Sequence, residues 1–370
     1  MSFAYYATLT YDHTLCGTAD SSGFPALIYA SGPTLRDVAH GGYVNSSTGA
    51  DILVFSGSSL ATQLPSEIDY YDNVNGIVWV WAYISTLSHT ADGTVCVALG
   101  NASPPARTGG VWNSALVGVY HLPGSADSTS NGLNATYNSM TSTLGKIGNA
   151  AASTNVGGIS STTYIQLPAN SIIDDVFRSS QYAFSFWFNL AGDQSGQNAQ
   201  IFGTYPGTTY APCVGSGVGG LSGFGVVQAG FQVVTSTSMP SSGAWHHCLV
   251  TWSHADSDTL RLYIDNVLVG SGNTYNAPIQ TTGAVFSLGG SDYLYVSVNG
   301  ATDELRIRSA VPTDSLRTAE YNNQNSPGNI GAPGFWTWGS WVPTASGSLF
   351  RPAMMNGLGG GGPFFINPLG

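Results

Sequence analysis

Hydrophobic and polar positions alternate with a period of two in several stretches of the chain. Trp79, Trp81 and Tyr83 fall on one side of the stretch 77–83, and a longer alternation of aromatic residues runs through 182–190. Such alternation predicts β-strands that bury one face. Clusters of Gly, Asn, Ser and Pro separate these short stretches, which is typical of β-sandwiches. We therefore predict an all-β protein built from β-sandwich (jelly-roll) domains.

Helical signals are few. The stretches 171–180 and 313–323 could each form a short helix, and Thr313 or Asp314 would cap the second one. Charged residues make up only 8% of the chain, and Lys146 is its single lysine. Long solvated helices depend on Glu and Lys, so this composition excludes a mostly helical protein.

Two changes in composition divide the chain. Pro104 and Pro105 interrupt any strand, and from residue 342 onward the sequence becomes rich in Gly and Pro. We predict a small β-sandwich over 1–103, a larger one over 108–341, and an extended C-terminal arm over 342–370. The tryptophans at 336, 338 and 341 are expected to close the second sandwich.

The charge balance narrows the function. Lys and Arg together number 9 against 20 Asp and Glu, for a net charge of −11, which excludes a nucleic-acid binder that grips phosphates. No apolar run approaches the roughly 18 to 20 residues of a membrane helix. Residues 1–10 read as a strand, so we expect no secretory signal. A surface rich in Ser, Thr, Asn and Gly nevertheless suits an extracellular protein, such as a virion component released by lysis.

The cysteines indicate no metal or redox motif. No C-x-x-C spacing occurs among the four of them. One disulfide in each sandwich is one interpretation. Buried free thiols are the favoured interpretation if assembly occurs in a reducing cytosol, where thiols stay reduced. The residues are Cys16, Cys96, Cys213 and Cys248.

Six short motifs between residues 110 and 341 follow one another in a recognisable order. They are Tyr120-His121-Leu122 with 127–134, the turn 145–148, the strand 184–188, the stretch 245–252, the stretch 262–266, and Asp303-Glu304-Leu305-Arg306-Ile307 with 320–324. In this order they resemble the laminin-G-like branch of the concanavalin-A-like lectin/glucanase superfamily. The resemblance implies a jelly-roll β-sandwich and a glycan or cell-surface ligand.

Residues 3–101 carry a second set of motifs. They are Phe24-Pro25, the stretch 49–55, the stretch 67–72, the strand with Trp79 and Trp81, and Gly100-Asn101. This part resembles a family of unknown function that commonly precedes lectin-like domains. The resemblance implies a small β-sandwich without an agreed activity.

Glu67, Asp69 and Asp72 are the sharpest catalytic candidates. Retaining glucanases of the lectin-like fold carry a similar carboxylate series on one strand, with the two acting groups about 5 Å apart. Here Asp72 points away from the other two unless a bulge intervenes. We interpret the series as a solvated strand edge or turn and predict no catalytic residue.

His246, His247 and Cys248 are of metal-ligating types. Neighbours on a strand face opposite sides, however, and no third ligand is evident beside His246 and Cys248. We interpret these histidines as structural.

Asp303, Glu304 and Asp127 are the metal candidates, because hard cations prefer carboxylate oxygens. The family resemblance implies calcium, which related lectin-like domains bind near a sheet edge. In the alternative interpretation Asp303 caps a turn and Glu304 pairs with Arg306 or Arg308. The side chains of Asp303 and Glu304, being adjacent on a strand, are expected on opposite faces.

Two further groups are predicted to make contacts with other molecules. Loop tyrosines could stack on sugars or proteins: Tyr205, Tyr210, Tyr293 and Tyr295. Apolar residues set among glycines in the arm cannot form a core of their own, and would lie across a neighbouring molecule: Phe350, Met354, Met355, Phe364, Phe365 and Ile366.

We therefore predict a non-enzymatic structural protein on the surface of a virion, of the tailed-bacteriophage kind. Its arm would dock on capsid or tail proteins or on a sister subunit, and its lectin-like domain would bind a cell-surface glycan. The alternative is a secreted carbohydrate-active enzyme or its carbohydrate-binding module.

Overall fold

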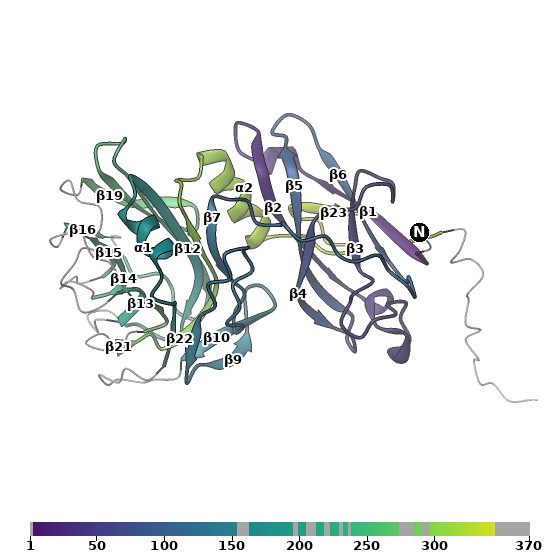
Figure 1. Cartoon of the computed structure of the whole chain (residues 1–370), viewed down its shortest axis with the longest axis horizontal. Helices are drawn as coiled ribbons and strands as arrows, with labels where there is room; N and C mark the ends of the chain where they lie inside the picture. The colour runs from purple at the N-terminus through teal and green to yellow at the C-terminus, as the bar shows by residue number, and fades with distance from the viewer. Residues whose placement is uncertain are drawn as a thin grey trace, which may run out of the picture.

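The protein is nearly all β, as the alternation predicts (Figure 1). The structure, a computed structural model, describes residues 3–153, 163–194, 199–204, 212–217, 223–228, 232–235, 238–273, 285–290 and 296–344. Both expected helices are present: α1 (Ser171–Arg178) and α2 (Asp314–Asn325). The side chain of Asn170 accepts from the backbone N–H of Ile172, and that of Thr313 from Leu316, so each helix begins at a polar cap.

The first sandwich packs a five-stranded sheet on a three-stranded one. The larger sheet has the order β23-β1-β6-β3, with β24 also paired to β1, and the smaller has the order β2-β5-β4. Their bounds are β1 (Tyr5–Tyr11), β2 (Ser21–Ser31), β3 (Leu53–Ser56), β4 (Ser66–Asp72), β5 (Ile77–Leu87), β6 (Gly93–Leu99), β23 (Trp336–Trp338) and β24 (Val342–Pro343), with short 3-10 turns at His13–Leu15, Pro33–Leu35 and Val38–His40.

In β5 the aliphatic residues, not the aromatic ones, enter the core of the first sandwich. Val78, Val80 and Ala82 are buried there. The opposite face of the strand carries Trp79 and Trp81 toward the second sandwich, where Trp81 is fully buried.

The second sandwich packs two eight-stranded sheets face to face. One has the order β19-β18-β17-β12-β22-β10-β9, with β7 also on β22; the other has the order β16-β15-β14-β13-β20-β11-β8, with β21 on β13. The bounds are β7 (Leu116–Tyr120), β8 (Thr136–Asn138), β9 (Thr141–Leu144), β10 (Asn149–Ser153), β11 (Tyr164–Gln166), β12 (Gln181–Leu190), β13 (Ala199–Thr204), β14 (Cys213–Ser216), β15 (Phe224–Gln228), β16 (Gln232–Thr235), β17 (Trp245–Ser253), β18 (Thr259–Ile264), β19 (Val267–Asn273), β20 (Phe286–Leu288), β21 (Val296–Ser297) and β22 (Gly300–Arg308). Phe184, Phe186 and Phe188 line its core from β12.

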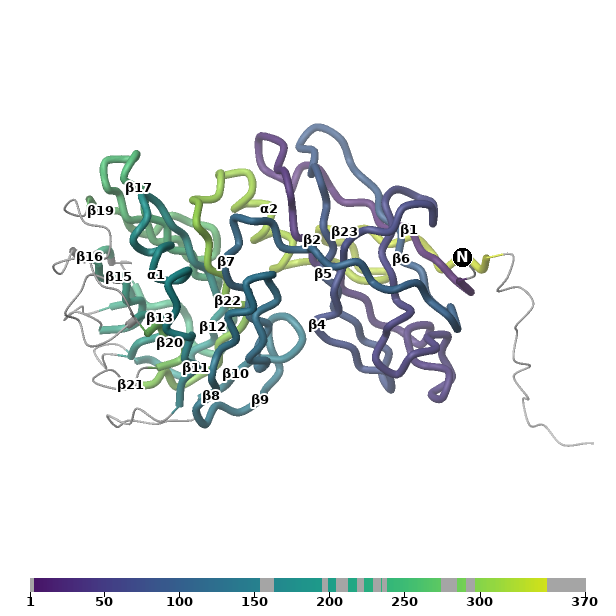
Figure 2. Tube along the Cα trace, in the orientation of Figure 1, coloured from purple at the N-terminus to yellow at the C-terminus, as the bar shows by residue number. Residues whose placement is uncertain are grey.

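The chain returns to the first sandwich after α2 (Figure 2). Trp338 pairs with Leu9 of β1, and Pro343 pairs with Tyr5 of the same strand. Phe335 and Trp336 are fully buried in the first core. The boundary predicted at residue 341 is therefore wrong: these residues complete the first sandwich, because β1 would otherwise present an unpaired edge.

The predicted arm also begins later than residue 342. Val342 and Pro343 form β24, and the backbone N–H of Thr344 donates to the carbonyl of Ala4 over 2.9 Å. The apolar residues assigned to the arm, from Phe350 to Ile366, lie outside the described residues.

Helix α2 lies between the two sandwiches (Figure 1). On one side the side chain of Asn323 accepts from the N–H of Leu27 over 2.6 Å and donates to the carbonyl of Leu27 over 2.9 Å. On the other side Gln324 accepts from the indole N–H of Trp187 over 2.7 Å. We call the surface where the two sandwiches and α2 meet the seam.

All four cysteines are buried and unpaired, which confirms the favoured interpretation. Burial raises the pKa of Cys16 to about 12 and that of Cys96 to about 11, so both stay protonated thiols. Among the described residues, neither helix is long and apolar enough to cross a membrane.

Candidate functional site at the seam

Two carboxylates of β4, those of Glu67 and Asp69, face the second sandwich, and a bulge lies at Asp69. Ile68 is opposite Val80 and Tyr70 is opposite Trp79, so Asp69 is an extra residue in its strand. The extra residue breaks strict alternation, and Asp69 accepts a hydrogen bond from the indole N–H of Trp81 over 3.1 Å. Its side chain is only 5% exposed. The expectation of a solvated edge at Asp69 is thus wrong.

A second bulge, in β22, does the same from the other sandwich. Asp303 is opposite Trp187, Arg306 is opposite Ser185, and Glu304 has a φ of +52°. The bulge places the side chains of Asp303 and Glu304 on the same, seam-facing side of the sheet. The expectation that these neighbours face opposite sides is therefore wrong, because it assumed an unbroken strand.

His121 joins the two sets of carboxylates. It follows β7, and its Nε2 lies 2.6 Å from Oε1 of Glu67. Its Nδ1 is hydrogen-bonded to Glu304 and lies 3.4 Å from Oδ2 of Asp69. Both ring nitrogens therefore face acceptors, which an imidazolium satisfies with its two N–H groups. The sequence indicated His121 only as a member of a family motif. Nothing in the sequence showed that His121 contacts carboxylates from both sandwiches.

The electrostatics of the cluster follow from burial and from these partners. Burial by itself would lower the pKa of His121, but Glu304 and Asp69 outweigh it and hold that pKa well above its usual value. Burial raises the pKa of Asp69 to about 7, although His121 opposes the rise. Burial and the charge of Glu304 hold the pKa of Asp303 well above its usual value. For Glu304, His121 and Arg306 outweigh burial and lower its pKa.

Arg306 closes the cluster from β22. Its guanidinium donates to Oε2 of Glu304 over 3.2 Å and lies 4.4 Å from the ring centre of Trp81. Oδ2 of Asp303 accepts from the N–H of Ile147 over 2.9 Å. The alternative to a metal, a Glu304–Arg306 pair with Asp303 capping a turn, is therefore present in the structure.

Asp127 does not join Asp303 and Glu304. Its carboxylate accepts from the backbone N–H groups of Val119 and Thr129 over 3.1 and 2.9 Å. At the seam the potential metal ligands that come together are instead Asp69, His121 and Glu304. An imidazole nitrogen among the donors does not fit calcium, which takes oxygen ligands.

The other predicted candidates are structural. Asp72 accepts from the N–H groups of Val74 and Asn75 over 3.0 and 2.9 Å, which makes it a turn residue. Nδ1 of His246 lies 2.6 Å from Asp265. His247 packs against Trp187, and burial with nearby Arg306 lowers its pKa to about 3. Among the described residues, no cluster of three metal-ligating side chains includes His246 or Cys248.

A groove of about 350 Å³ opens beside the seam. One wall is the aromatic pair of Tyr29 on β2 and Trp79 on β5, which are half-buried and whose ring centres are 4.2 Å apart. The other walls come from the turn before β10 and from the end of α2 onward. The full lining is Tyr29, Trp79, Lys146, Gln324, Asn325, Ser326, Pro327, Gly328, Asn329, Ala332 and Pro333.

The loop tyrosines predicted to bind a ligand lie outside the described residues: Tyr205, Tyr210, Tyr293 and Tyr295. No pattern along the sequence indicates the groove. Trp79 was noted only as a member of an aromatic row, and nothing along the chain links it to residues 324–333.

Residues 159–315 match the concanavalin A-like lectin/glucanases superfamily. The second sandwich thus contains a lectin-like domain, as its motifs imply; the family resemblance of residues 3–101 stays a prediction. No curated protein matches the chain.

Several solved structures are similar in fold. Domain 4 of AbnA, an extracellular GH43 arabinanase from Geobacillus stearothermophilus, in complex with arabinotriose, is 22% identical with a TM-score of 0.43, over 55% of this chain and 96% of that one. The binding domain of Paraclostridial Mosquitocidal Protein 1 is 15% identical with a TM-score of 0.42, over 57% and 53%. The CBM40 of a Ruminococcus gnavus IT-sialidase, bound to α2,3-sialyllactose, is 12% identical with a TM-score of 0.35, over 44% and 94%. At these values the likeness carries no inference about ligands.

Proposed function

We propose that this protein is a non-enzymatic carbohydrate-binding protein and that the groove beside the seam holds the glycan. The observation that carries the proposal is the half-exposed pair Tyr29–Trp79 facing polar groups from the other side of the groove. An apolar wall with a few convergent polar groups is the usual composition of a small-molecule site.

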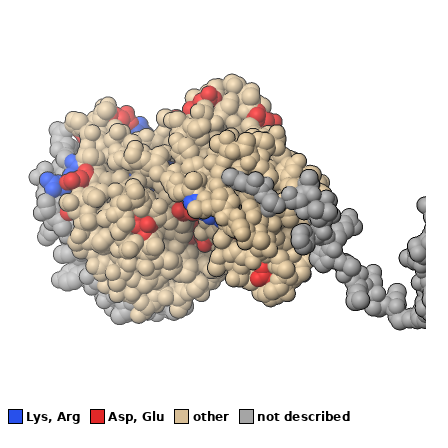
Figure 3. All heavy atoms as spheres, turned by 45° about the vertical axis from the view of Figure 1, so that its right-hand side comes forward, with Lys and Arg blue, Asp and Glu red and all other residues tan. Residues whose placement is uncertain are grey.

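The chemistry of the groove suits a sugar. A pyranose has an apolar C–H face, which an aromatic side chain can cover, and a rim of hydroxyl groups. The rim would meet Asn325 and Lys146, whose Nζ donates to Oδ1 of Asn325 over 2.9 Å and is thereby held in place. Charged groups are few and scattered on the face drawn in Figure 3, and among the described residues that line the groove only Lys146 is charged, which favours a ligand without clustered charges.

The absence of catalysis is part of the proposal. Hydrolysis of a glycosidic bond needs two carboxyl groups that flank the substrate. No Asp or Glu is among the described residues that line the groove. Glu67, Asp69 and Glu304 are close together, but they face His121 in the seam, and this supports a structural use of those acids.

Oligosaccharide titration tests the groove. Screening on a glycan array, followed by calorimetry with the best ligand, is expected to show binding that Trp79→Ala weakens at least tenfold, or about 1.4 kcal/mol. Tyr83→Ala is the matched control, because Tyr83 lies on the same face of β5 but does not line the groove. Equal affinity for Trp79→Ala and the wild type would exclude this groove.

The alternative function, a carbohydrate-active enzyme, is tested with the same protein. Release of reducing sugar from any polysaccharide, lost in Glu67→Gln, would support the enzyme alternative and contradict our proposal.

We also propose a place on the surface of a virus particle, with residues 345–370 docked on capsid or tail proteins or on a sister subunit. Sparse charge and the apolar residues among glycines after residue 344 support it. The truncation that tests it ends at Thr344, because 342–344 pair with β1. The truncated protein is expected to fold and to be missing from assembled particles; incorporation at full occupancy would refute the anchoring role.

A further inference from the structure

The seam gathers more acidic than basic side chains. Four carboxylates gather there, from Glu67 and Asp69 on β4 and from Asp303 and Glu304 on β22. They face two cations, His121 and Arg306. Asp303, Glu304 and Arg306 are at most 1% exposed. A buried carboxyl group must be protonated or paired with a positive group, and a bound cation would supply such a partner.

One buried acceptor in the seam has no partner. Oδ1 of Asp303 makes no hydrogen bond, although Asp303 is fully buried and its Oδ2 accepts from Ile147. Asp303 directly precedes Glu304, and the bulge keeps both on the seam-facing side. Nε and Nη1 of Arg306 also lack hydrogen-bond partners. Buried polar atoms are nearly always satisfied, so these unpartnered atoms point to a group that the seam can still bind.

The donor atoms at the centre have the arrangement of a metal site. One nitrogen of His121, one oxygen of Asp69 and one oxygen of Glu304 lie within 4.8 Å of one another. Imidazole and carboxylates together suit divalent transition metals such as zinc. The outer partners are also present: Glu67 lies 2.6 Å from Nε2 of His121, and Trp81 donates to Asp69. A carboxylate on the second ring nitrogen is the usual support of a metal-bound histidine.

We propose that Asp69, His121 and Glu304 bind one divalent transition-metal ion, which links the two sandwiches across the seam. The metal takes the place of the proton on Nδ1 of His121, and that proton is released to solvent. Nε2–H keeps its hydrogen bond to Glu67. Asp69 comes from the first sandwich and the other two ligands from the second, so neither sandwich alone holds the complete site.

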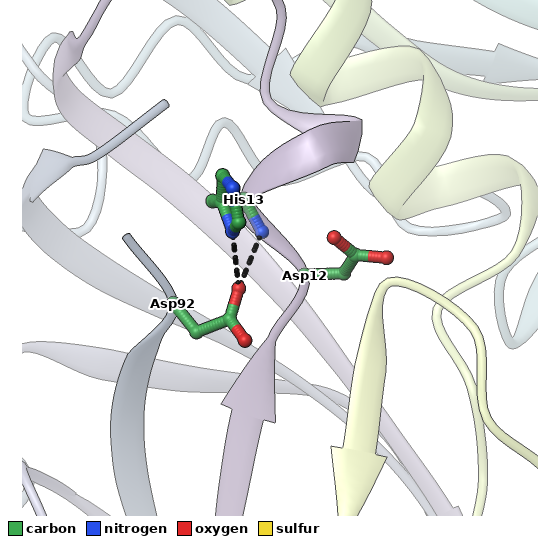
Figure 4. Close-up of side chains that lie close together, drawn as sticks. All are labelled: Asp12, His13 and Asp92. Atoms are coloured by element: carbon green, nitrogen blue, oxygen red, sulfur yellow. Dashed lines mark hydrogen bonds and ion pairs between the residues drawn. The ribbon is translucent and has the colours of Figure 1, made fainter. Parts of the chain in front are cut away.

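A second cluster provides a matched control. Asp12, His13 and Asp92 also lie within 4.8 Å of one another, but Asp12 and Asp92 are exposed (Figure 4). His13 and Asp92 pair over 2.6 Å, while Asp12 accepts from Thr14 over 2.9 Å. No buried unpaired atom accompanies this group in the described residues.

Zinc titration of the full chain after chelator treatment tests the site. Calorimetry is expected to give one Zn²⁺ per chain and the release of about one proton, seen by comparing buffers of different ionisation enthalpy. Zn²⁺ should also raise the Tm by several degrees. Asp69→Asn, which keeps an acceptor for Trp81, is expected to weaken Zn²⁺ binding at least tenfold, and Asp92→Asn to leave it unchanged.

Three results would overturn the proposal. They are no binding of Zn²⁺ or Mn²⁺ by the wild type, equal Zn²⁺ affinity in Asp69→Asn, and loss of binding in Asp92→Asn. The Tm of each variant without metal shows whether it folds. Binding of Ca²⁺ in preference to Zn²⁺ would also count against a site with a nitrogen ligand.

Discussion

Asp69 and Glu304 both occupy β-bulges, one in each sandwich, and both meet the same nitrogen of His121 at the seam. A bulge adds a residue to one strand and re-aims the side chains around it. The bulge in β22 turns Glu304 to the face that Asp303 occupies, and acids from separate domains thus meet at a single histidine.

His121 is expected to be essential to the stability of the seam. In His121→Gln, buried Glu304 and Asp69 lose their cation, and removing one partner from a buried pair costs about 3–5 kcal/mol. Chemical denaturation measures this loss. Glu67→Gln is the comparison: the side chain of Glu67 is 28% exposed, so its loss should cost at most about 1 kcal/mol. Equal midpoints for His121→Gln and the wild type would mean that the cluster contributes nothing.

His247 is expected to make the second sandwich acid-sensitive. Burial, with Arg306 and Arg308 nearby, lowers its pKa in the folded state to about 3, whereas the unfolded value is near 6.5. The unfolded state therefore binds the proton more readily, and stability falls as the pH falls from about 6.5 toward 3. Against His247→Gln, the wild type should lose a few kcal/mol over this range. His254→Gln, at a site with a 64% exposed side chain, is the control for replacing a surface histidine.

Trp336 is expected to stabilise the first sandwich, although it follows the lectin-like domain in the chain. It is fully buried, and its indole N–H donates to the carbonyl of Leu27 over 2.8 Å. Trp336→Ala should cost about 3–5 kcal/mol, measured by denaturation. Trp338→Ala, at a half-buried position of the same strand, should cost clearly less. The reverse order would contradict the placement of Trp336 in this core.

Asn323 is expected to hold α2 on β2. Its side chain satisfies both the N–H and the carbonyl of Leu27, and it is fully buried. Asn323→Ala leaves the N–H of Leu27 without this acceptor, which should cost about 1–3 kcal/mol in denaturation experiments. Asn322→Ala, which removes one bond to the carbonyl of Leu15 at a half-buried position, is the control with a smaller expected loss. An undiminished stability of Asn323→Ala would show that α2 docks by apolar contact alone.

The local pattern of the chain was sufficient for the fold class and the two helices, and the ordered family motifs indicated the lectin-like domain. Strand alternation and polar caps are properties of a few neighbouring residues, so they can be recognised without any knowledge of distant contacts. The residues of the seam were also noticed one by one, as Glu67 and Asp69 in one place and Asp303 and Glu304 in another.

Their arrangement was decided only by the tertiary structure. Alternation shows that β5 has two faces, but not that Val80 enters the core while Trp79 and Trp81 face the second sandwich. A bulge leaves no sign in the spacing of residues, because it depends on the strand opposite.

Contacts between residues far apart in the sequence complete both the seam and the first sandwich, and the local pattern does not predict them. His121 meets Glu67 and Glu304 across 54 and 183 residues of sequence, and Trp336 pairs with Tyr11 at the other end of the chain. Local propensities carry no information about such contacts, which form because buried charges need partners and a bare sheet edge needs a strand.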